Sequence, residues 1–454
     1  MKINKKQMIL SGNIYKVLFS LSLPIMINNL IQTMYNLVDG IWVSKISSVH
    51  FAATAFVFPI NFLFISLGIG IFVAGTSILS QFIGANQEEK ARQYTGQIIA
   101  LSIISSLVFT LIGIIFSPLI IKAMGASGDI ARYGNTYLRI SFLELPFIFL
   151  FFNINAIRNA QGDTVTPTIL SGISAILNII LDPIFIFGFG WGIAGAAWAT
   201  VLSRALLSFY GIKIIFSKDN ILKPDFKKFK FNKHIIKEVM NVGFPATIGQ
   251  AGAAIGFIVL NGFIVSYGTT TMAAFGMVNR VTSLISQPAM GIGAALTAII
   301  GQNIGAGNLD RAKESFKKAS LLALSFGVLG GILMIVFNSG IVNFFIQSKD
   351  DPGVISQGIV YLNFIAISMP LMGMFSVIQG VFQGSGHTKY SMAMEIGRLW
   401  VVRIPMILLF KNFTNFGSPG IWFSMSFSNL LVVLYGMYIY SKGGWSHSMV
   451  KTDS

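Results

Sequence analysis

The sequence predicts an all-α integral membrane protein: twelve transmembrane helices in two six-helix lobes that are related by a parallel pseudo-two-fold repeat. Of its 454 residues, 54% are hydrophobic and only 11% are charged, whereas about a quarter of a soluble chain is charged. Long stretches such as 51–87 and 239–279 hold no charged residue at all. A third observation is that the chain repeats itself. These features exclude the three soluble domains that the length alone would suggest.

The predicted spans follow from the apolar runs. A helix needs about 20 apolar residues to cross about 30 Å of hydrocarbon. Because several runs are longer than that, each is expected to hold one tilted span together with its interfacial ends. In chain order, the predicted spans lie near 16–42, 51–82, 93–118, 133–157, 165–188, 192–215, 237–266, 270–300, 315–340, 355–380, 388–411 and 419–442.

The internal repeat predicts the domain organisation. The segment QFIGANQEEKAR (81–92) recurs as QNIGAGNLDRAK (302–313), and Pro24 and Pro146 correspond to Pro245 and Pro370. Six spans therefore occur twice, and because six is even the two copies have the same orientation. We expect an N-terminal lobe over 1–216, a cytoplasmic linker over 217–236 and a C-terminal lobe over 237–454. Two lobes facing a central cavity favour a transporter.

The distribution of basic residues predicts the topology. The net charge is +16, but the lysines and arginines lie in short gaps between apolar runs, as in cytoplasmic loops that meet anionic lipid. Nucleic acid is therefore not expected as a partner. Both termini are predicted to be cytoplasmic, in a multi-pass protein of the cell inner (plasma) membrane. The basic start MKINKKQMIL has no nearby cleavage site and is not predicted to be a removable signal.

An enzyme is not expected. The chain has no cysteine and only four histidines, which are scattered at loops and span ends, and no HExxH, GxSxG or Walker motif occurs. Disulfides and thiolate-ligated metals are excluded. No cofactor is expected. The pairs Gly252-x-x-x-Gly256 and Gly327-x-x-x-Gly331 are interpreted as helix-packing signals.

Ionisable residues inside the spans are few, so each is a candidate for function. The acids are Asp39, Glu144, Asp182 and Glu395. Glu395 lies three residues before Arg398 on the same helix face, which predicts an ion pair. A partner for Glu144 is left open, since Arg139 is five residues away.

Asp39 and Asp182 have no basic residue one helical turn away, and they reach a similar depth in the first lobe. Asn178 lies one turn before Asp182, so the two side chains share a face. Pro183 removes a helical donor beside this site, and Pro24 predicts a bend in the first span. Two carboxylates in a poorly hydrated cavity cannot both ionise cheaply. The pattern predicts a site for a proton or Na⁺, and no other metal is expected.

The chain resembles the multidrug and toxic compound extrusion (MATE) transporters over nearly its whole length. The resemblance depends on SLPIMINNL and NLVDGIWVSK (22–45), QFIGA with its echo QNIGA, RNAQGDT (158–164) and LNIILDPIFIFGFGWGIAGAAWATVLS (177–203). It implies a twelve-helix antiporter that expels cationic amphipathic compounds in exchange for H⁺ or Na⁺. Within the prokaryotic branch similar to DNA-damage-inducible protein F, it assigns coupling to Asp39 and Asp182, with Asn178 and Thr200 beside them, and bending to Pro24.

A second bacterial branch of the family carries acids in the seventh and tenth spans, which have none here. A cation site in the C-terminal lobe is therefore not expected. Gln250, Asn261, Gln379 and Met34 are predicted to line the substrate cavity, whose walls should hold adaptable methionines and phenylalanines. The expected partners are small cationic substrates and the lipid bilayer, and the protein is expected to be a monomer.

A lipid or lipid-linked oligosaccharide flippase of the same superfamily is the alternative. Such a protein would line its cavity with basic residues that meet phosphate, and Arg280, Arg398 and Arg403 are candidates. The acids of the first lobe favour a cationic substrate instead.

Overall fold

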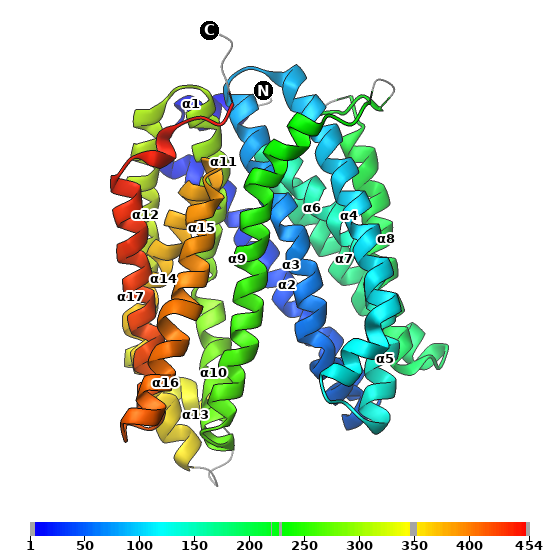
Figure 1. Ribbon diagram of the computed structural model, residues 1–454, viewed down its shortest axis with the longest axis vertical. Helices are drawn as coiled ribbons and strands as arrows, with labels where there is room; N and C mark the ends of the chain where they lie inside the picture. Colours follow the sequence, from blue (N-terminus) through cyan, green and yellow to red (C-terminus); the bar gives the residue numbers. More distant parts are fainter. Residues whose placement is uncertain (1–4, 219, 227–228, 346–351, 451–454) are drawn as a thin grey trace. The chain divides into compact units, whose positions relative to one another are not determined.

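All the secondary structure of the described residues is helical. The structure is a computed structural model that describes residues 5–218, 220–226, 229–345 and 352–450 (Figure 1). The first helices are α1 (Lys5–Ser11), α2 (Ile14–Ser44), α3 (Ser48–Gly84), α4 (Glu88–Ala123), α5 (Gly128–Phe142), α6 (Leu145–Ala160), α7 (Val165–Pro183), the π-helix η1 (Ile184–Gly188) and α8 (Gly192–Ile215). After the linker follow α9 (Lys233–Val265), α10 (Thr269–Ile285), α11 (Gln287–Gly305), α12 (Leu309–Val336), α13 (Asn338–Phe345), α14 (Pro352–Gly384), α15 (Thr388–Ile396), the π-helix η3 (Gly397–Arg403), α16 (Ile404–Phe413), α17 (Ser418–Ser441) and the 3₁₀ turn η4 (Gly444–Ser446).

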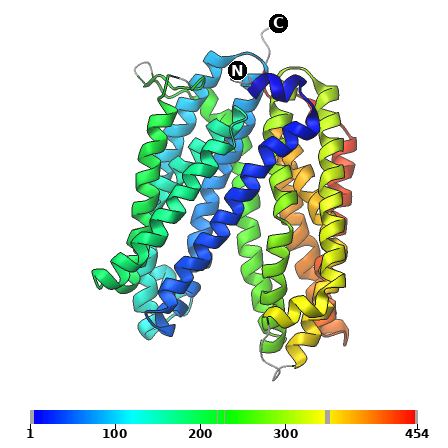
Figure 2. The same ribbon diagram turned by 180° about the vertical axis from the view of Figure 1, so that it is seen from behind.

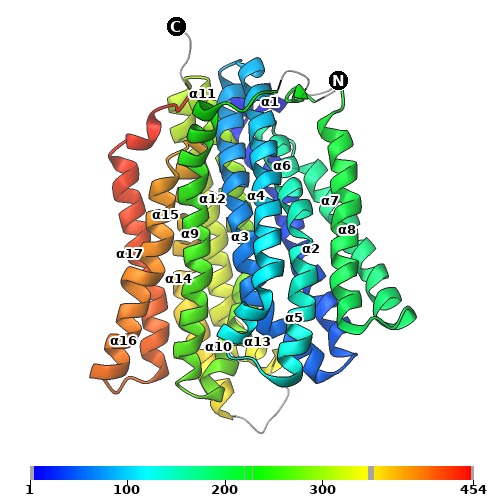
Figure 3. The ribbon, with the colours of Figure 1, turned by 45° about the vertical axis from the view of Figure 1, so that its right-hand side comes forward.

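Among these described helices, nine are long and apolar enough to cross a membrane, and two bent pairs bring the number to eleven if each pair is one span. The pairs are α5 with α6, bent by 44°, and α10 with α11, bent by 50°. The predicted span at 388–411 coincides with α15, η3 and α16, which follow one another without a break (Figure 3). Because this stretch carries Glu395, Arg398 and Arg403, apolarity alone does not identify it as a span. The number twelve stays a prediction.

The two bends occur where proline enters the first turn of the second helix of each pair. Pro146 lies at the start of α6 and Pro288 at the start of α11. A proline there has no N–H to lose and a suitable φ, so it begins a new helix rather than continuing the old one. Helix α2, in contrast, stays one helix through Pro24 (Figure 2). The α5–α6 bend leaves Glu144 between two helices.

Contacts divide the chain into two compact units. We call residues 27–251 the first-half unit, and the described residues up to Met26 together with those from Gly252 onward the second-half unit. The division falls inside α2 and inside α9, so each of these helices belongs to both units. The predicted lobes 1–216 and 237–454 are defined by the sequence repeat, and these limits stay a prediction.

In the first-half unit, a small buried cluster joins the helices that carry the candidate site. Val43 of α2, Ile186 of η1 and Ala196 of α8 pack together. Each lies four residues from a predicted site residue: Asp39, Asp182 and Thr200 respectively. Because residues four apart in an α-helix share a face, Val43 and Ala196 lie on the faces of α2 and α8 that carry Asp39 and Thr200, and Ile186 packs against them from just beyond the end of α7.

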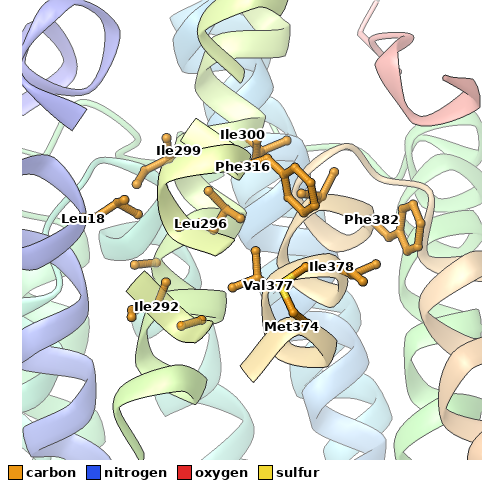
Figure 4. Close-up of a cluster of buried hydrophobic side chains, with 14 of the residues drawn as sticks. Leu18, Ile292, Leu296, Ile299, Ile300, Phe316, Met374, Val377, Ile378 and Phe382 are labelled. Atoms are coloured by element: carbon orange, nitrogen blue, oxygen red, sulfur yellow. The ribbon is translucent and has the colours of Figure 1, made fainter. Parts of the chain in front are cut away.

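The second-half unit has a larger core, in which side chains of α2, α11, α12 and α14 interdigitate. Leu18, Leu296, Phe316 and Ile378 are among its members (Figure 4). Small residues bring these helices close.

The two predicted packing signals both lie at such close contacts. A Cβ added at Gly256 would lie 3.2 Å from the Trp400 indole nitrogen, and one at Gly327 would lie 2.6 Å from the Pro370 backbone. These approaches confirm that the paired glycines serve helix packing.

Candidate functional site

Asp39 and Asp182 come from different helices of the first-half unit and lie within electrostatic range of each other. Asp182, at the end of α7, is completely buried, and Asp39 on α2 is half-buried. Within the described part of the chain, Asp39 Oδ1 and Asp182 Oδ2 are buried oxygens without a hydrogen-bond donor. A buried acceptor that lacks a donor is unfavourable by about 1–3 kcal/mol. Two such oxygens on neighbouring carboxylates form a site that a proton or a small cation would satisfy.

Asn178 and Thr200 complete the polar group that the sequence predicts. The Asn178 amide Nδ2 donates to Asp182 Oδ1 at 3.2 Å and to Thr200 Oγ1 at 3.4 Å. Asn178 is completely buried, and its own Oδ1 has no donor among the described residues. The predicted residues Asp39, Asn178, Asp182 and Thr200 are thus brought together from α2, α7 and α8. Their oxygens are the ligand type that hard cations prefer.

Two tyrosines that the sequence did not single out also belong to this group. The Tyr35 hydroxyl donates to Thr200 Oγ1 at 3.0 Å, and Tyr35 lies one turn before Asp39 on α2. Tyr137, on α5, interacts electrostatically with Asp39, Asp182 and Tyr35. The spacing of Tyr35 from Asp39 was a usable signal, because residues four apart share a helix face. Nothing in the sequence relates Tyr137 to this site.

A buried ion pair adjoins the site. Arg204 Nε on α8 lies 3.2 Å from Glu144 Oε1, in a contact without hydrogen-bond geometry, and Arg204 Nη2 donates to Gln32 at 3.2 Å. The Arg204 guanidinium also lies 5.4 Å from the centre of the Tyr35 ring. The sequence left the partner of Glu144 open. The pairing depends on which helices are neighbours, which spacing along the chain does not reveal.

Of the two predicted hinge residues, one lies inside a helix and the other lies at a helix end. Pro24 lies inside α2, in the part of that helix that belongs to the second-half unit. Pro183 ends α7, and η1 follows, in which Ile184 O accepts from Phe189 N at 2.9 Å across five residues. Such π-type turns are rare and often occur at functional sites. This turn begins two residues after Asp182.

The predicted cavity residues are dispersed. Met34 on α2 is 55% exposed, Gln250 on α9 is half-buried, and both belong to the first-half unit. Asn261 is exposed and Gln379 is buried, and both belong to the second-half unit.

Gln379 belongs instead to a separate polar network in the second-half unit. Its Nε2 donates to Glu395 Oε1 at 3.0 Å, and Ser391 donates to its carbonyl oxygen. Arg398 Nη2 lies 3.0 Å from Glu395 Oε2, which confirms the predicted ion pair. The Arg398 guanidinium covers the Phe375 ring at 4.3 Å. These contacts pair the carboxylate of Glu395, whereas Arg398 Nε is buried without a hydrogen-bond partner among the described residues.

Arg403 is buried on η3 and bonds to α17. It donates to Ser428 Oγ at 3.0 Å, to Asn429 Oδ1 at 3.0 Å and to the Met425 carbonyl at 3.3 Å. A guanidinium has five donors in a fixed fork, so it can bind several acceptors of a neighbouring helix together. We therefore assign Arg403 to helix packing.

Comparisons with known proteins identify the family. A family model described as MatE matches residues 24–184 and again 245–409, beginning at the two prolines that the internal repeat aligns. The chain is 28% identical over 427 residues to the probable multidrug resistance protein YoeA of Bacillus subtilis (strain 168), covering 91% of each chain. It is 26% identical over 430 residues to the multidrug export protein MepA of Staphylococcus haemolyticus (strain JCSC1435), covering 94% of this chain and 93% of that protein.

Solved structures of transporters share the fold of this chain. The fold matches the outward-facing conformation of a multidrug resistance MATE family transporter of the MOP superfamily with a TM-score of 0.90 and 27% identity, over 98% of this chain and 99% of that one. It matches a MOP superfamily transporter from Pyrococcus furiosus Vc1 (DSM3638), for which reverse polarity of the binding pocket suggests a different function, with a TM-score of 0.91 and 26% identity over the same shares. The chain belongs to the MatE family, whose members are multi-pass membrane transporters and not enzymes.

Proposed function

We propose that this protein is a secondary active antiporter that exports cationic amphipathic compounds in exchange for H⁺ or Na⁺. The observation that carries the proposal is a group of three buried oxygens, on Asp39, Asn178 and Asp182, that have no donor among the residues that the structure describes. A proton or Na⁺ bound among them would satisfy these acceptors and neutralise carboxylate charge in a poorly hydrated site. The coupling ion is the only cofactor in this mechanism.

Loading and unloading of this site drives alternating access. Each bound monovalent cation removes one negative charge from the group around Asp39 and Asp182, and this change reshapes the helices that carry them. Pro24 and Pro183 act as hinges, because a proline removes one hydrogen bond of the helical ladder and makes that turn easier to bend. A membrane potential adds about 2.3 kcal/mol per charge per 100 mV.

The substrate class follows from charge and from the relatives. YoeA and MepA are named as multidrug proteins, and an acidic site selects cationic drugs. Met34, Gln250, Asn261 and Gln379 contact the substrate in this proposal. Methionine suits a site for varied substrates because its side chain is flexible and polarizable.

A flippase for phosphate-bearing lipids is less well supported. Of its three candidate arginines, Arg398 is paired with Glu395 and Arg403 bonds to α17, so neither guanidinium is directed to a ligand phosphate. Arg280 is exposed. The transporter with a pocket of reverse polarity illustrates why the sign of the charge decides between these functions.

We also propose that the protein works as a monomer in the inner membrane, with both termini in the cytoplasm. Its two six-helix lobes, 1–216 and 237–454, are joined by the basic linker 217–236. The lobes would open alternately to the two sides of the membrane. This is the arrangement expected of parallel repeats.

Ethidium efflux from proteoliposomes tests the proposal, with a pH gradient or a Na⁺ gradient imposed separately. At least one of the two gradients, imposed alone, should drive ethidium efflux by the wild-type protein. Asp39→Asn and Asp182→Asn should each lower the driven rate at least about tenfold, which corresponds to about 1.4 kcal/mol. Asp310→Asn, at a fully exposed acid, is the matched control and should keep the wild-type rate. Efflux that needs neither gradient, or that both site variants retain, would refute the proposal.

A further inference from the structure

Glu144 and Arg204 are charged side chains that the proposed exchange does not use, although they adjoin its site. The side chain of Glu144 is 5% exposed and that of Arg204 is 11% exposed, with 3.2 Å between Oε1 and Nε. A buried ion pair contributes little to the stability of the folded protein, because the desolvation of the two charges offsets much of their attraction. Replacement of both partners by neutral groups of similar size is often harmless. Stability alone therefore does not account for this pair.

The pair is connected to the exchange site in two ways. Glu144 interacts electrostatically with Asp39, so its charge is felt by the carboxylate that is proposed to bind the cation. Arg204 lies one turn after Thr200 on α8, and its guanidinium faces the ring of Tyr35, whose hydroxyl donates to Thr200. The contacts lead from Arg204 through Tyr35, Thr200 and Asn178 to Asp182.

The charged and titratable groups facing this region come from four helices and one bend. Helix α2 contributes Tyr35 and Asp39, α5 contributes Tyr137, and α7 contributes Asp182. The α5–α6 bend contributes Glu144 and α8 contributes Arg204. This set has three carboxylates and one guanidinium. A site that takes monovalent cations is therefore sensitive to whether the third carboxylate is neutralised.

We infer that Arg204 sets the charge of the exchange site: it neutralises Glu144, so that only Asp39 and Asp182 exchange cations. Arg204 is thus a positioning and charge-setting residue that acts through Glu144. This inference deepens the proposed function and depends on it. Without Arg204, Glu144 would be a third acidic group beside Asp39 that has no counter-charge, and the site would take up cations, protons included, more readily. Without Glu144, the buried Arg204 would be unpaired and would weaken cation binding.

The two single variants should therefore change the ion dependence in opposite directions. In proteoliposomes with the gradient that drives the wild type, the measured quantity is the driving-cation concentration, H⁺ or Na⁺, that gives half-maximal ethidium efflux. Arg204→Gln should lower this concentration at least about tenfold and Glu144→Gln should raise it at least about tenfold. A tenfold shift is roughly what one unit charge about 12 Å away produces at an effective dielectric constant near 20, and a nearer charge produces more. The double variant Glu144→Gln/Arg204→Gln should return to within about threefold of the wild type.

Two controls separate charge from structure. Arg204→Lys keeps the charge and should keep the wild-type concentration. Glu395→Gln/Arg398→Gln removes the matching buried pair of the second-half unit and should not shift the driving-cation concentration, whatever its effect on rate. If only one single variant reaches the membrane, comparison with the double variant still gives the sign of its shift.

The outcomes distinguish this inference from the proposed function. If the wild type follows neither gradient, the proposed function is wrong and the inference is wrong with it. If the wild type follows one gradient but both single variants shift in the same direction, or neither shifts, only the inference is wrong. The same conclusion holds if neither single variant folds while the neutral double variant works normally, because the pair is then structural.

Discussion

The amide of Asn178 donates at 3.2 Å to the carboxylate of Asp182, one helical turn further along α7, with both residues completely buried. This bond engages Asp182 Oδ1 and leaves Oδ2 without a donor in the described chain. The same amide reaches Thr200 on α8. Asn178 therefore orients the carboxylate and links two helices of the site.

Asn178→Ala should lower gradient-driven ethidium efflux about tenfold, because it removes the two bonds that orient Asp182 and Thr200. A buried hydrogen bond to a charged group contributes about 1.5–3 kcal/mol. The initial efflux rate in proteoliposomes, normalised to the amount of protein, measures this. The matched control is Asn153→Ala, at a buried asparagine whose amide, among the described residues, donates to the Phe149 carbonyl of its own helix and to no other group. Equal losses in the two variants would contradict a special role for Asn178.

Tyr35→Phe should reduce efflux about fivefold. It removes the hydroxyl that donates to Thr200 Oγ1 but keeps the ring that Arg204 faces. One neutral hydrogen bond contributes about 1 kcal/mol of stabilisation, and its loss corresponds to about a fivefold change in rate. The same vesicle assay measures the rate, and Tyr210→Phe, at an exposed tyrosine of α8, should leave it unchanged. A Tyr35→Phe protein as active as the wild type would show that this bond does not assist the site.

Arg403→Lys should lower the melting temperature in detergent, although it keeps the charge. A lysine cannot make the forked contacts to Ser428, Asn429 and the Met425 carbonyl together. The expected loss is roughly 2 kcal/mol or more, since buried acceptors on α17 lose their donor. Arg280→Lys, on an exposed side chain, is the control. An unchanged melting temperature for Arg403→Lys would refute the packing role.

Gly380→Val should destabilise the second-half unit by about 1–3 kcal/mol or more. A Cβ at Gly380 on α14 would collide with the carbonyl oxygen of Gly293 on α11, and overpacking of this kind forces helices apart. Gly276→Ala is the matched control in α10, because its Cβ would meet nothing within 4 Å. Alanine is the better helix former, so the control should be neutral or slightly stabilising. Thermal unfolding of both variants tests the difference.

The topology is testable by single cysteines, because the chain has none of its own. Ser446→Cys, after α17, should be protected from a membrane-impermeant maleimide in intact cells and should react after lysis. Ser127→Cys, between α4 and α5, should react in intact cells. The opposite labelling pattern would invert the predicted orientation and place both termini outside.

Local patterns predicted much of the architecture. The spans predicted at 165–188 and 192–215 coincide with α7–η1 and with α8, because long apolar runs bounded by polar turns leave few alternatives in a membrane. The Glu395–Arg398 pair was also predictable, since residues three apart on one helix meet whatever lies around them. The same argument placed Asn178 beside Asp182.

Other features required the tertiary structure. The contacts Glu144–Arg204 and Tyr35–Thr200 join residues far apart in the chain. The size of the bend between α5 and α6, 44°, is likewise known only from the structure. The sequence by itself determined which segments are helical and which side chains share a helix face, because hydrogen bonding and periodicity act within each segment. Only the tertiary structure decided which faces meet, because that choice depends on how the side chains of neighbouring helices fit together.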